Sequence, residues 1–169
     1  RELSTHPMNV RPMAFLPRSE GILLQHENNS ISEWSLSTGR ETPVWQAPDR
    51  VRAWAVSEDE HWLTAFSYSG ASIFRDRSTR NQTNLGVNLP QASGANFSAD
   101  GRQFAVVSWI GGGKVWSLDP LRELGTLRGF MQGTHSVVFS PNGDRLAAGG
   151  AGKETLKLYD SVKYQELLT

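Results

Sequence analysis

Apolar residues return along this chain at intervals of about forty residues. The first series lies 41, 41 and 42 residues apart and comprises Phe15, Val56, Phe97 and Phe139. Seven residues after each of these, a short apolar run begins at Ile22, Leu63, Phe104 and Leu146. A third series, with spacings of 40, 42 and 43 residues, comprises Trp34, Phe74, Trp116 and Tyr159. Three series that keep one period indicate a single supersecondary unit used four times.

The last copy of this unit predicts four short strands. They are expected at residues 134–140, 145–148, 155–160 and 166–169, with a turn at 141–144 and a loop at 149–153. Pro141 presets φ for the turn, and Asn142-Gly143 accepts positive φ. The third copy repeats this order, whereas no strand is placed between Gln82 and Gln91. Because no segment has a long helical period, we expect an all-β propeller of about four four-stranded antiparallel blades.

The repeat resembles the Trp-Asp (WD) repeat family of β-propellers. The stretches that carry the resemblance are 139–149 with 156–160 and 97–102 with 115–117, and weaker copies lie at 31–35 and 73–76. That family often has a Gly-His pair before the first strand and an Asp between the second and third strands. Here Thr134 separates Gly133 from His135, and no copy has the loop Asp. The repeats are therefore degenerate, and we expect their stability to depend on packing more than on that polar network.

The ends of the chain do not match a closed ring. Residues 1–5 match 122–126, a fourth strand, so residues 1–6 are expected to belong to a blade outside this chain. The blades are then expected at residues 7–49, 50–91, 92–132 and 133–169. Because open sheet faces and edges drive association, we expect a partial propeller. Its remaining blades would come from the parent chain, in a seven- or eight-bladed ring, or from a homodimer of four plus four.

Composition narrows the classes of partner. The chain has 169 residues, with 17 basic and 17 acidic side chains and no net charge, which argues against nucleic acid. Apolar runs such as 104–107 are too short to span a bilayer, so no membrane partner is expected. The absence of Cys excludes disulfides, thiolate metal sites and a Cys nucleophile.

Motifs for catalysis or ligand binding fail on their spacing. Gly152-Lys153 lacks the first Gly of a phosphate-binding loop, because position 147 is Ala, and Glu154 stands where Ser or Thr is needed. The four His residues form no His-x-x-x-His pair, and no Gly-x-Ser-x-Gly motif occurs. We therefore predict no catalytic residue, no metal site and no cofactor.

Candidate partner-binding residues follow from the resemblance, which implies docking on the face where each first strand begins. The residues four positions before the members of the first landmark series are Arg11, Arg52, Ser93 and His135, and Tyr68 and Trp109 fall in or beside loops of the same face.

Arg favours acidic or phosphorylated peptides, because it makes bidentate bonds to carboxylates and phosphates. Exposed aromatic residues are common anchors. The alternatives are that both Arg residues are merely solvated and that Trp109 packs between blades. Trp62 is predicted to be exposed at the opposite edge.

The pattern favours a non-enzymatic scaffold for protein–protein or protein–peptide interaction. The resemblance implies a regulatory or sensing part of a larger signalling protein, and a cytoplasmic location is expected. The alternative is a propeller enzyme or a small-ligand-binding propeller, similar to the periplasmic TolB type. The mostly apolar or small residues of the inner strands, such as Ala53, Ala95 and Val137, disfavour catalysis.

Overall fold

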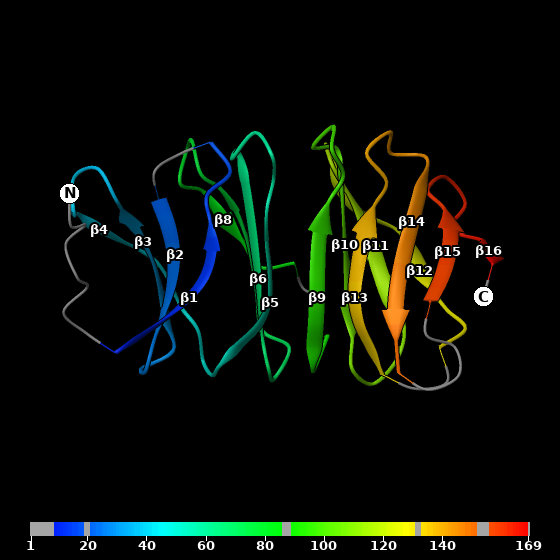
Figure 1. Cartoon of the computed structure of the whole chain (residues 1–169), viewed down its shortest axis with the longest axis horizontal. Coiled ribbons are helices and arrows are strands. Elements are labelled where there is room, and N and C mark those ends of the chain that lie inside the picture. Colours follow the sequence, from blue (N-terminus) through cyan, green and yellow to red (C-terminus); the bar gives the residue numbers. More distant parts are fainter. Residues whose placement is uncertain (1–8, 19–20, 86–88, 131–132, 152–155, 169) are drawn as a thin grey trace.

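The described part of the chain forms four four-stranded antiparallel sheets that follow one another in sequence order (Figure 1). This computed structural model describes residues 9–18, 21–85, 89–130, 133–151 and 156–168. The expected strand at residues 1–6 lies outside the described residues. Each sheet is a simple up-and-down meander, so neighbouring strands are joined by short connections. The all-β fold of about four blades is confirmed.

Blade 1 consists of β1 (Val10–Phe15), β2 (Gly21–His26), β3 (Ser30–Ser35) and β4 (Glu41–Gln46). Blade 2 consists of β5 (Val51–Val56), β6 (Trp62–Ser67), β7 (Ser72–Asp76) and β8 (Gln82–Thr83). Blade 3 consists of β9 (Ala92–Phe97), β10 (Gln103–Ser108), β11 (Gly113–Leu118) and β12 (Leu121–Leu127). Blade 4 consists of β13 (Thr134–Phe139), β14 (Arg145–Gly150), β15 (Leu156–Asp160) and β16 (Glu166–Leu168). The weak pattern after residue 82 corresponds to a fourth strand of only two residues.

The first strands of blades 2, 3 and 4 lie side by side, with β9 between β5 and β13. Figure 1 shows that the first strands of all four blades begin on one side of the molecule. We call this side the loop face; it carries the connections β2–β3, β4–β5, β6–β7, β8–β9 and β10–β11 and lies at the bottom of Figure 1. The opposite side, the turn face, carries the turns that follow the first and third strands.

Apolar side chains gather in three layers, one between each pair of successive blades. Between blades 1 and 2 the layer is mainly aliphatic and includes Leu23, Ile31, Val51, Leu63, Ala65 and Ile73. Between blades 2 and 3 it is mainly aromatic and includes Phe66, Phe74, Phe97, Phe104 and Trp116. Between blades 3 and 4 it includes Val107, Val115, Leu127, Val137, Leu146 and Tyr159. The sheets of blades 2 and 3 have apolar side chains on both faces, because successive side chains of a strand point to opposite sides.

One member of the third landmark series is wrong by one residue. Trp34, Trp116 and Tyr159 each lie opposite the second-strand landmark of their own blade, as in the pair Phe104 and Trp116. In blade 2, however, Leu63 pairs with Arg75, whereas Phe74 pairs with Thr64. A shift of one residue turns a side chain to the other face of a sheet. Phe74 therefore packs towards blade 3, and Arg75 occupies the landmark position.

The turn between first and second strand has the same polar structure in blades 2, 3 and 4. A Ser hydroxyl donates to an Asp or Asn two residues later, at 2.5 Å in Ser57–Asp59, 2.6 Å in Ser98–Asp100 and 2.8 Å in Ser140–Asn142. The same hydroxyl oxygen accepts from the backbone N–H five residues on, at 2.9, 2.9 and 3.0 Å. These side-chain hydrogen bonds thus satisfy polar groups of the turn that the reversing backbone would leave without a partner.

The two end blades turn apolar side chains outward. On blade 1, Phe15 is 72% exposed, because the landmark face of this blade points away from blade 2. Trp34 lies on the same face and is half-buried, in contrast to the buried Trp116 and Tyr159. On blade 4, the outward face carries Val138 and Leu168, which are 51% and 60% exposed. The outward face of blade 1 corresponds to the landmark face, and the outward face of blade 4 to the opposite face. Faces of these two types pack against each other between successive blades inside the molecule.

Candidate partner-binding face

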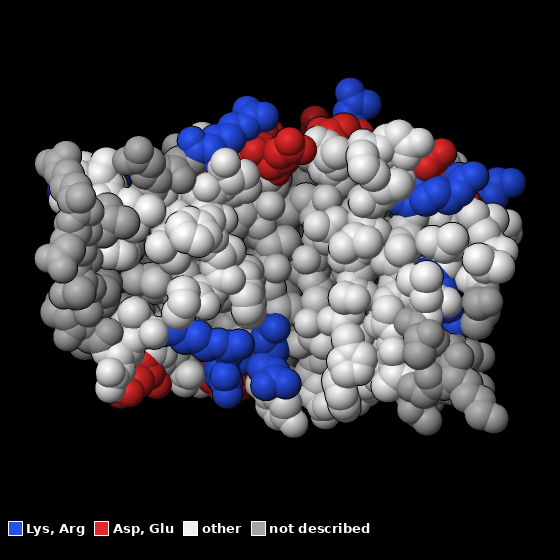
Figure 2. Space-filling model, viewed as in Figure 1, with Lys and Arg blue, Asp and Glu red and all other residues white. Residues whose placement is uncertain are grey.

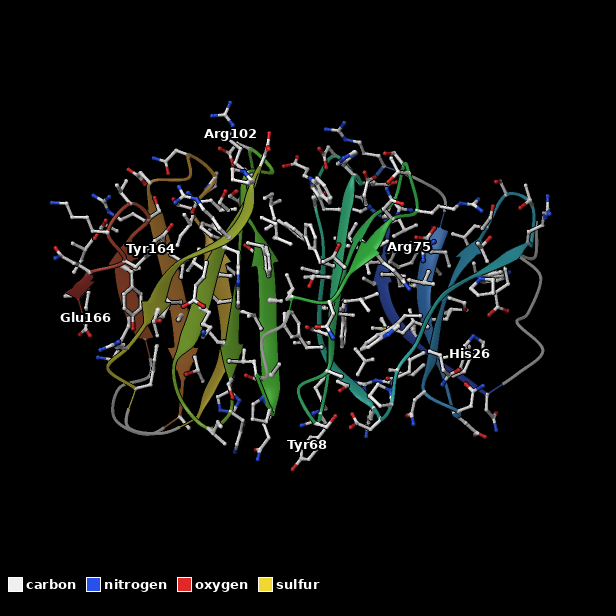
Figure 3. The ribbon with its side chains drawn as sticks, turned by 180° about the vertical axis from the view of Figure 1, so that it is seen from behind. His26, Tyr68, Arg75, Arg102, Tyr164 and Glu166 are labelled. Carbon is white, nitrogen blue, oxygen red and sulfur yellow. The ribbon has the colours of Figure 1, made fainter. Side chains whose placement is uncertain are left out.

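Two Arg residues of the loop face lie beside aromatic rings. Arg52 near the start of β5 is exposed, and its guanidinium carbon lies 5.9 Å from the ring centroid of Tyr68, which is 51% exposed. Arg11 near the start of β1 is also exposed and lies 6.0 Å from the ring of Trp54 in blade 2. Figure 2 shows basic side chains gathered beneath β1 and β5, and Figure 3 shows Tyr68 projecting from this edge. Cation–π contacts of this kind hold long Arg side chains near one position.

Backbone bonds hold the loop that carries Tyr68. Tyr68 N donates to Arg50 O at 2.9 Å, and Gln91 N donates to Tyr68 O at 2.9 Å, so the loop is tied to both flanking connections. The carboxylate of Asp49 accepts from Ser69 N at 3.2 and 3.3 Å. Burial by itself would raise the pKa of Asp49, but the hydrogen bonds from Ser69, Ser67 and Tyr68 outweigh it and lower the pKa. Asp49 is therefore ionised at neutral pH and fastens the loop.

A second exposed group lies where blades 3 and 4 meet. Trp109 is 49% exposed, and its ring lies perpendicular to the ring of His135 at a centroid distance of 4.3 Å and an interplanar angle of 87°. Ile110 beside it is 63% exposed. A Cβ at Gly133 would come within 2.3 Å of Trp109 O, so only glycine allows the loop this close to blade 4. Trp109 thus packs between blades and remains accessible on the loop face.

Ser93 differs from the other candidates because its hydroxyl bonds within the protein. Its Oγ donates to Thr134 O in blade 4 and lies 3.3 Å from Val107 O. The structure therefore brings Arg52 together with Tyr68, and Trp109 together with His135. It places Ser93 half-buried at the junction of blades 3 and 4.

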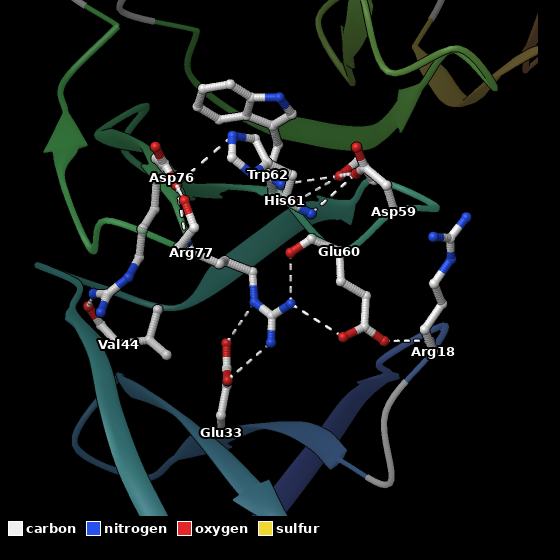
Figure 4. Close-up of polar contacts among 12 residues, drawn as sticks. Arg18, Glu33, Val44, Asp59, Glu60, His61, Trp62, Asp76 and Arg77 are labelled. Carbon is white, nitrogen blue, oxygen red and sulfur yellow. Dashed lines mark hydrogen bonds and ion pairs between the residues drawn. The ribbon is translucent and has the colours of Figure 1, made fainter.

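The turn face carries a polar cluster of a different kind, centred on Arg77 (Figure 4). Its guanidinium group donates to both carboxylate oxygens of Glu33 in blade 1, at 2.9 and 3.0 Å. It also donates to Glu60 O at 2.6 Å and lies 3.3 Å from the Glu60 carboxylate. Burial opposes the charge of Arg77, but the bonds to Glu33 and Glu60 outweigh it and raise the pKa. The cluster is satisfied internally and joins blade 1 to blade 2.

Solved structures that resemble this chain are WD40-repeat proteins. The solved structure titled "Structure of U3-55K" has a TM-score of 0.81 at 17% identity over 99% of this chain. The structure titled "Crystal structure of RRP9 WD40 repeats" has a TM-score of 0.78 at 19% identity over 99% of this chain. The chain has the fold of a WD40-repeat β-propeller. It spans about half of each of these solved chains, 53% and 52%, and is therefore comparable to part of a propeller.

The comparisons based on sequence find no relative of this propeller. No family model matches it, and no curated protein matches it. At 17–19% identity the likeness to these solved structures extends to the architecture alone.

One arrangement in the propeller has the residue types of a hydrolytic triad but not the geometry. His26 Nε2 lies 2.8 Å from Ser32 Oγ and 2.7 Å from Glu41 Oε1. In a catalytic triad the acid binds the ring nitrogen that does not contact the hydroxyl, so that the other nitrogen can take the proton. Here both groups meet the same nitrogen, and Ser32 is only 4% exposed. The arrangement therefore fits a structural hydrogen-bonded group at the edge of blade 1.

The described residues contain no group of three or more His, Asp or Glu residues that could hold a metal ion. Within the same described ranges, no helix is long and apolar enough to cross a membrane. Trp62, predicted to be exposed, is half-buried and stacks on Phe74 at 4.8 Å, because blade 3 covers it.

Sequence reasoning missed three residues of the loop face. Arg50 is exposed beside Arg11 and Arg52, Ile110 is exposed beside Trp109, and Gln25 is buried below Arg11. The repeat could have indicated Ile110, because it follows Trp109 in the same loop. Arg50 and Gln25 lie outside the landmark series, and only the packing of blade 1 on blade 2 brings them together.

Proposed function

We propose that this propeller is a non-enzymatic scaffold that binds a protein or peptide on its loop face. The observation that carries the proposal is the combination of Tyr68, Trp109 and Ile110, which are 49–63% exposed, with Arg52 on the same face. Large apolar side chains held rigidly on a surface are common anchors for protein partners, because little conformational entropy is lost when they are covered.

The partner that best fits this face is an acidic or phosphorylated peptide. Arg11 and Arg52 are exposed near the starts of β1 and β5, and Arg50 is exposed in the connection that leads into β5. Arg guanidinium groups bind carboxylates and phosphates through paired hydrogen bonds. Nucleic acid fits less well, because the chain as a whole has no excess of basic residues.

The blades described here are proposed to be one part of a ring. We keep the division into blades at residues 7–49, 50–91, 92–132 and 133–169. The outward apolar faces of blades 1 and 4 support further blades at both ends, supplied by the parent chain or by a second copy. From the resemblance to WD40-repeat propellers we further propose that these blades are a regulatory or sensing part of a larger signalling protein with a cytoplasmic location.

Light scattering after size exclusion tests the arrangement of blades. A dimer would support closure by a second copy, because the outward faces of blades 1 and 4 would cover each other. A monomer would support further blades in the parent chain.

Selection of random peptides from a displayed library tests the binding face itself. We expect the selected peptides to be rich in Asp and Glu, and Tyr68→Ala or Trp109→Ala to weaken their binding by about tenfold or more. Arg11→Glu combined with Arg52→Glu should abolish binding of the acidic peptides. Arg102→Glu on the turn face, where the side chain is 85% exposed, is the matched control. Peptides that bind all loop-face variants as well as the wild type would contradict the proposal.

A further inference from the structure

A hollow of about 380 Å³ opens on the loop face of blade 1, next to the start of blade 2. Its lining includes Arg11, Arg50, Gln25, Asn29 and Glu27. It is distinct from the Tyr68 and Trp109 anchors, because none of their side chains lines it. The volume suits one side chain of a partner together with adjacent backbone.

The charged groups at this hollow favour an anion. Arg11 and Arg50 contribute two guanidinium groups, against the single carboxylate of Glu27. Among the described residues, neither guanidinium group has a hydrogen bond or an ion pair to a carboxylate, in contrast to the fully engaged Arg77 on the turn face. The carboxylate of Asp49, the residue before Arg50, accepts from Ser69 N, and among the described residues it forms no ion pair with either guanidinium group. Donors that the protein leaves unused remain available to a ligand.

Gln25 gives the hollow a buried polar group. Its side chain is 5% exposed, lines the hollow, and has a buried Nε2 without a hydrogen-bond partner among the described residues. A buried donor without a partner is costly, so such a group in a pocket is expected to find an acceptor. Because Nε2 has no partner among the described residues, no hydrogen bond of this atom has to be broken for it to donate to a ligand oxygen in the hollow.

We infer that the hollow bounded by Arg11, Arg50 and Gln25 is a binding site for an acidic side chain of a peptide partner, with an oxyanion held between the two guanidinium groups and the Gln25 amide. This inference rests on the proposed function and makes it specific, since it assigns the acidic contact to one pocket. A carboxylate and a phosphoserine present the same chemistry to these donors.

The test uses three synthetic peptides that differ at one position. Each is a neutral Gly-Ser peptide that carries Glu, phosphoserine or Gln at its centre, titrated into isotopically labelled protein and followed by NMR. The side-chain NH₂ signals of Gln25 and the Nε–H signals of Arg11 and Arg50 should shift with the Glu and phosphoserine peptides. They should not shift with the Gln peptide. A larger effect of one acidic peptide identifies whether carboxylate or phosphate is preferred.

Variants separate binding from structure. Arg50→Gln should weaken binding of the acidic peptides by about tenfold, because a charge-assisted hydrogen bond is lost. Gln25→Leu should weaken binding to a smaller degree while leaving the melting temperature equal or higher, since a buried unpaired donor is removed. Gln25→Glu should abolish binding through charge repulsion. Arg102→Gln on the turn face is the matched control.

The outcomes distinguish this inference from the proposed function. If no acidic peptide shifts the three side-chain signals, the pocket is not an oxyanion site, whatever the loop face binds. If library-selected peptides lose binding in Tyr68→Ala but not in Arg50→Gln, the scaffold function stands and the pocket assignment fails. If neither variant changes their binding, both fail.

Discussion

The interface between blades 1 and 2 and the interface between blades 2 and 3 join the same repeated sheets with different chemistry. Between blades 2 and 3, four aromatic rings stack in sequence, with centroid distances of 4.8 Å for Trp62–Phe74, 5.5 Å for Phe74–Phe104 and 4.9 Å for Phe104–Trp116. Between blades 1 and 2 the buried layer is aliphatic, and Arg77 binds Glu33 and Glu60 at its rim.

The difference originates at the landmark positions of the two blades. Blade 3 has Phe97, Phe104 and Trp116 on the face towards blade 2. Blade 2 has Leu63 and Arg75 at the corresponding positions facing blade 1, and Arg75 Nη1 donates to Val44 O at 2.8 Å. A repeat therefore conserves the backbone arrangement while each interface uses the side chains available to it.

The largest expected effect comes from removing the central ring of the aromatic stack. Phe104 is fully buried and stacks on both Phe74 and Trp116. Phe104→Ala should lower the free energy of unfolding by about 3–5 kcal/mol, because it loses the transfer energy of the ring and leaves a cavity. Urea denaturation measures the change.

Phe15→Ala is the matched control for this prediction. Phe15 belongs to the first landmark series but is 72% exposed, so its loss should cost less than about 1 kcal/mol. Equal losses for the two variants would show that the end face of blade 1 is covered in solution, or that the stack contributes little.

Much of the fold could be predicted from the sequence, because it depends on local alternation and on turns. Ser98-Ala99-Asp100-Gly101 forms a turn through its own side chains, and its strands follow directly on both sides. The face on which Phe74 lies could not be predicted, because positions 74 and 75 both agree with the spacing of the third landmark series to within one residue. Pairing with the neighbouring strand decides between them.

A smaller effect is expected at the rim between blades 1 and 2. Arg77 has a side chain that is only 15% exposed, and it bonds to two Glu residues. Arg77→Met keeps the length of the side chain but removes these charged hydrogen bonds, so we expect a loss of about 2 kcal/mol. Arg102→Met, at an 85% exposed position 4.0 Å from Asp100, is the control and should change stability by less than about 0.5 kcal/mol.

Glu60 makes this prediction more specific. It has a φ of 61°, at the position where blades 3 and 4 have Gly101 and Gly143 with φ of 65° and 74°. In the Arg77→Met background, Glu60→Gly should raise stability by about 0.5 kcal/mol, because backbone strain is relieved. In the wild type it should lower stability, since the contact of Arg77 with the Glu60 carboxylate is lost as well, although the bond to the backbone carbonyl of residue 60 remains. The same sign in both backgrounds would show that the Arg77 cluster does not hold Glu60 in place.

The candidate site was less predictable than the fold. Arg11, Arg52, Tyr68 and Trp109 follow from their place in the repeat, and all lie on the loop face. Gln25 could not be identified in this way. What distinguishes it is a buried Nε2 without a hydrogen-bond partner among the described residues, and this depends on the packing of blade 1 against blade 2.

The smallest effect concerns the turns that flank the two interfaces, and it depends on pH. The hydrogen bond from Ser57 is the main cause that lowers the pKa of Asp59. At Asp100 burial acts in the opposite direction, but the bonds from Ser98 and the Arg102 backbone outweigh it and lower the pKa as well. A lowered pKa in the folded state stabilises the fold above the unfolded value of about 3.9, and this contribution is lost as pH falls through the folded pKa.

The Asp59→Asn/Asp100→Asn double variant should therefore lose less stability than the wild type in urea denaturation between about pH 5 and pH 2. Asn142→Asp in blade 4 should lose more, because it adds a third titrating turn. If all three proteins lose stability equally, the hydrogen bonds in these turns do not distinguish the ionised from the protonated carboxyl.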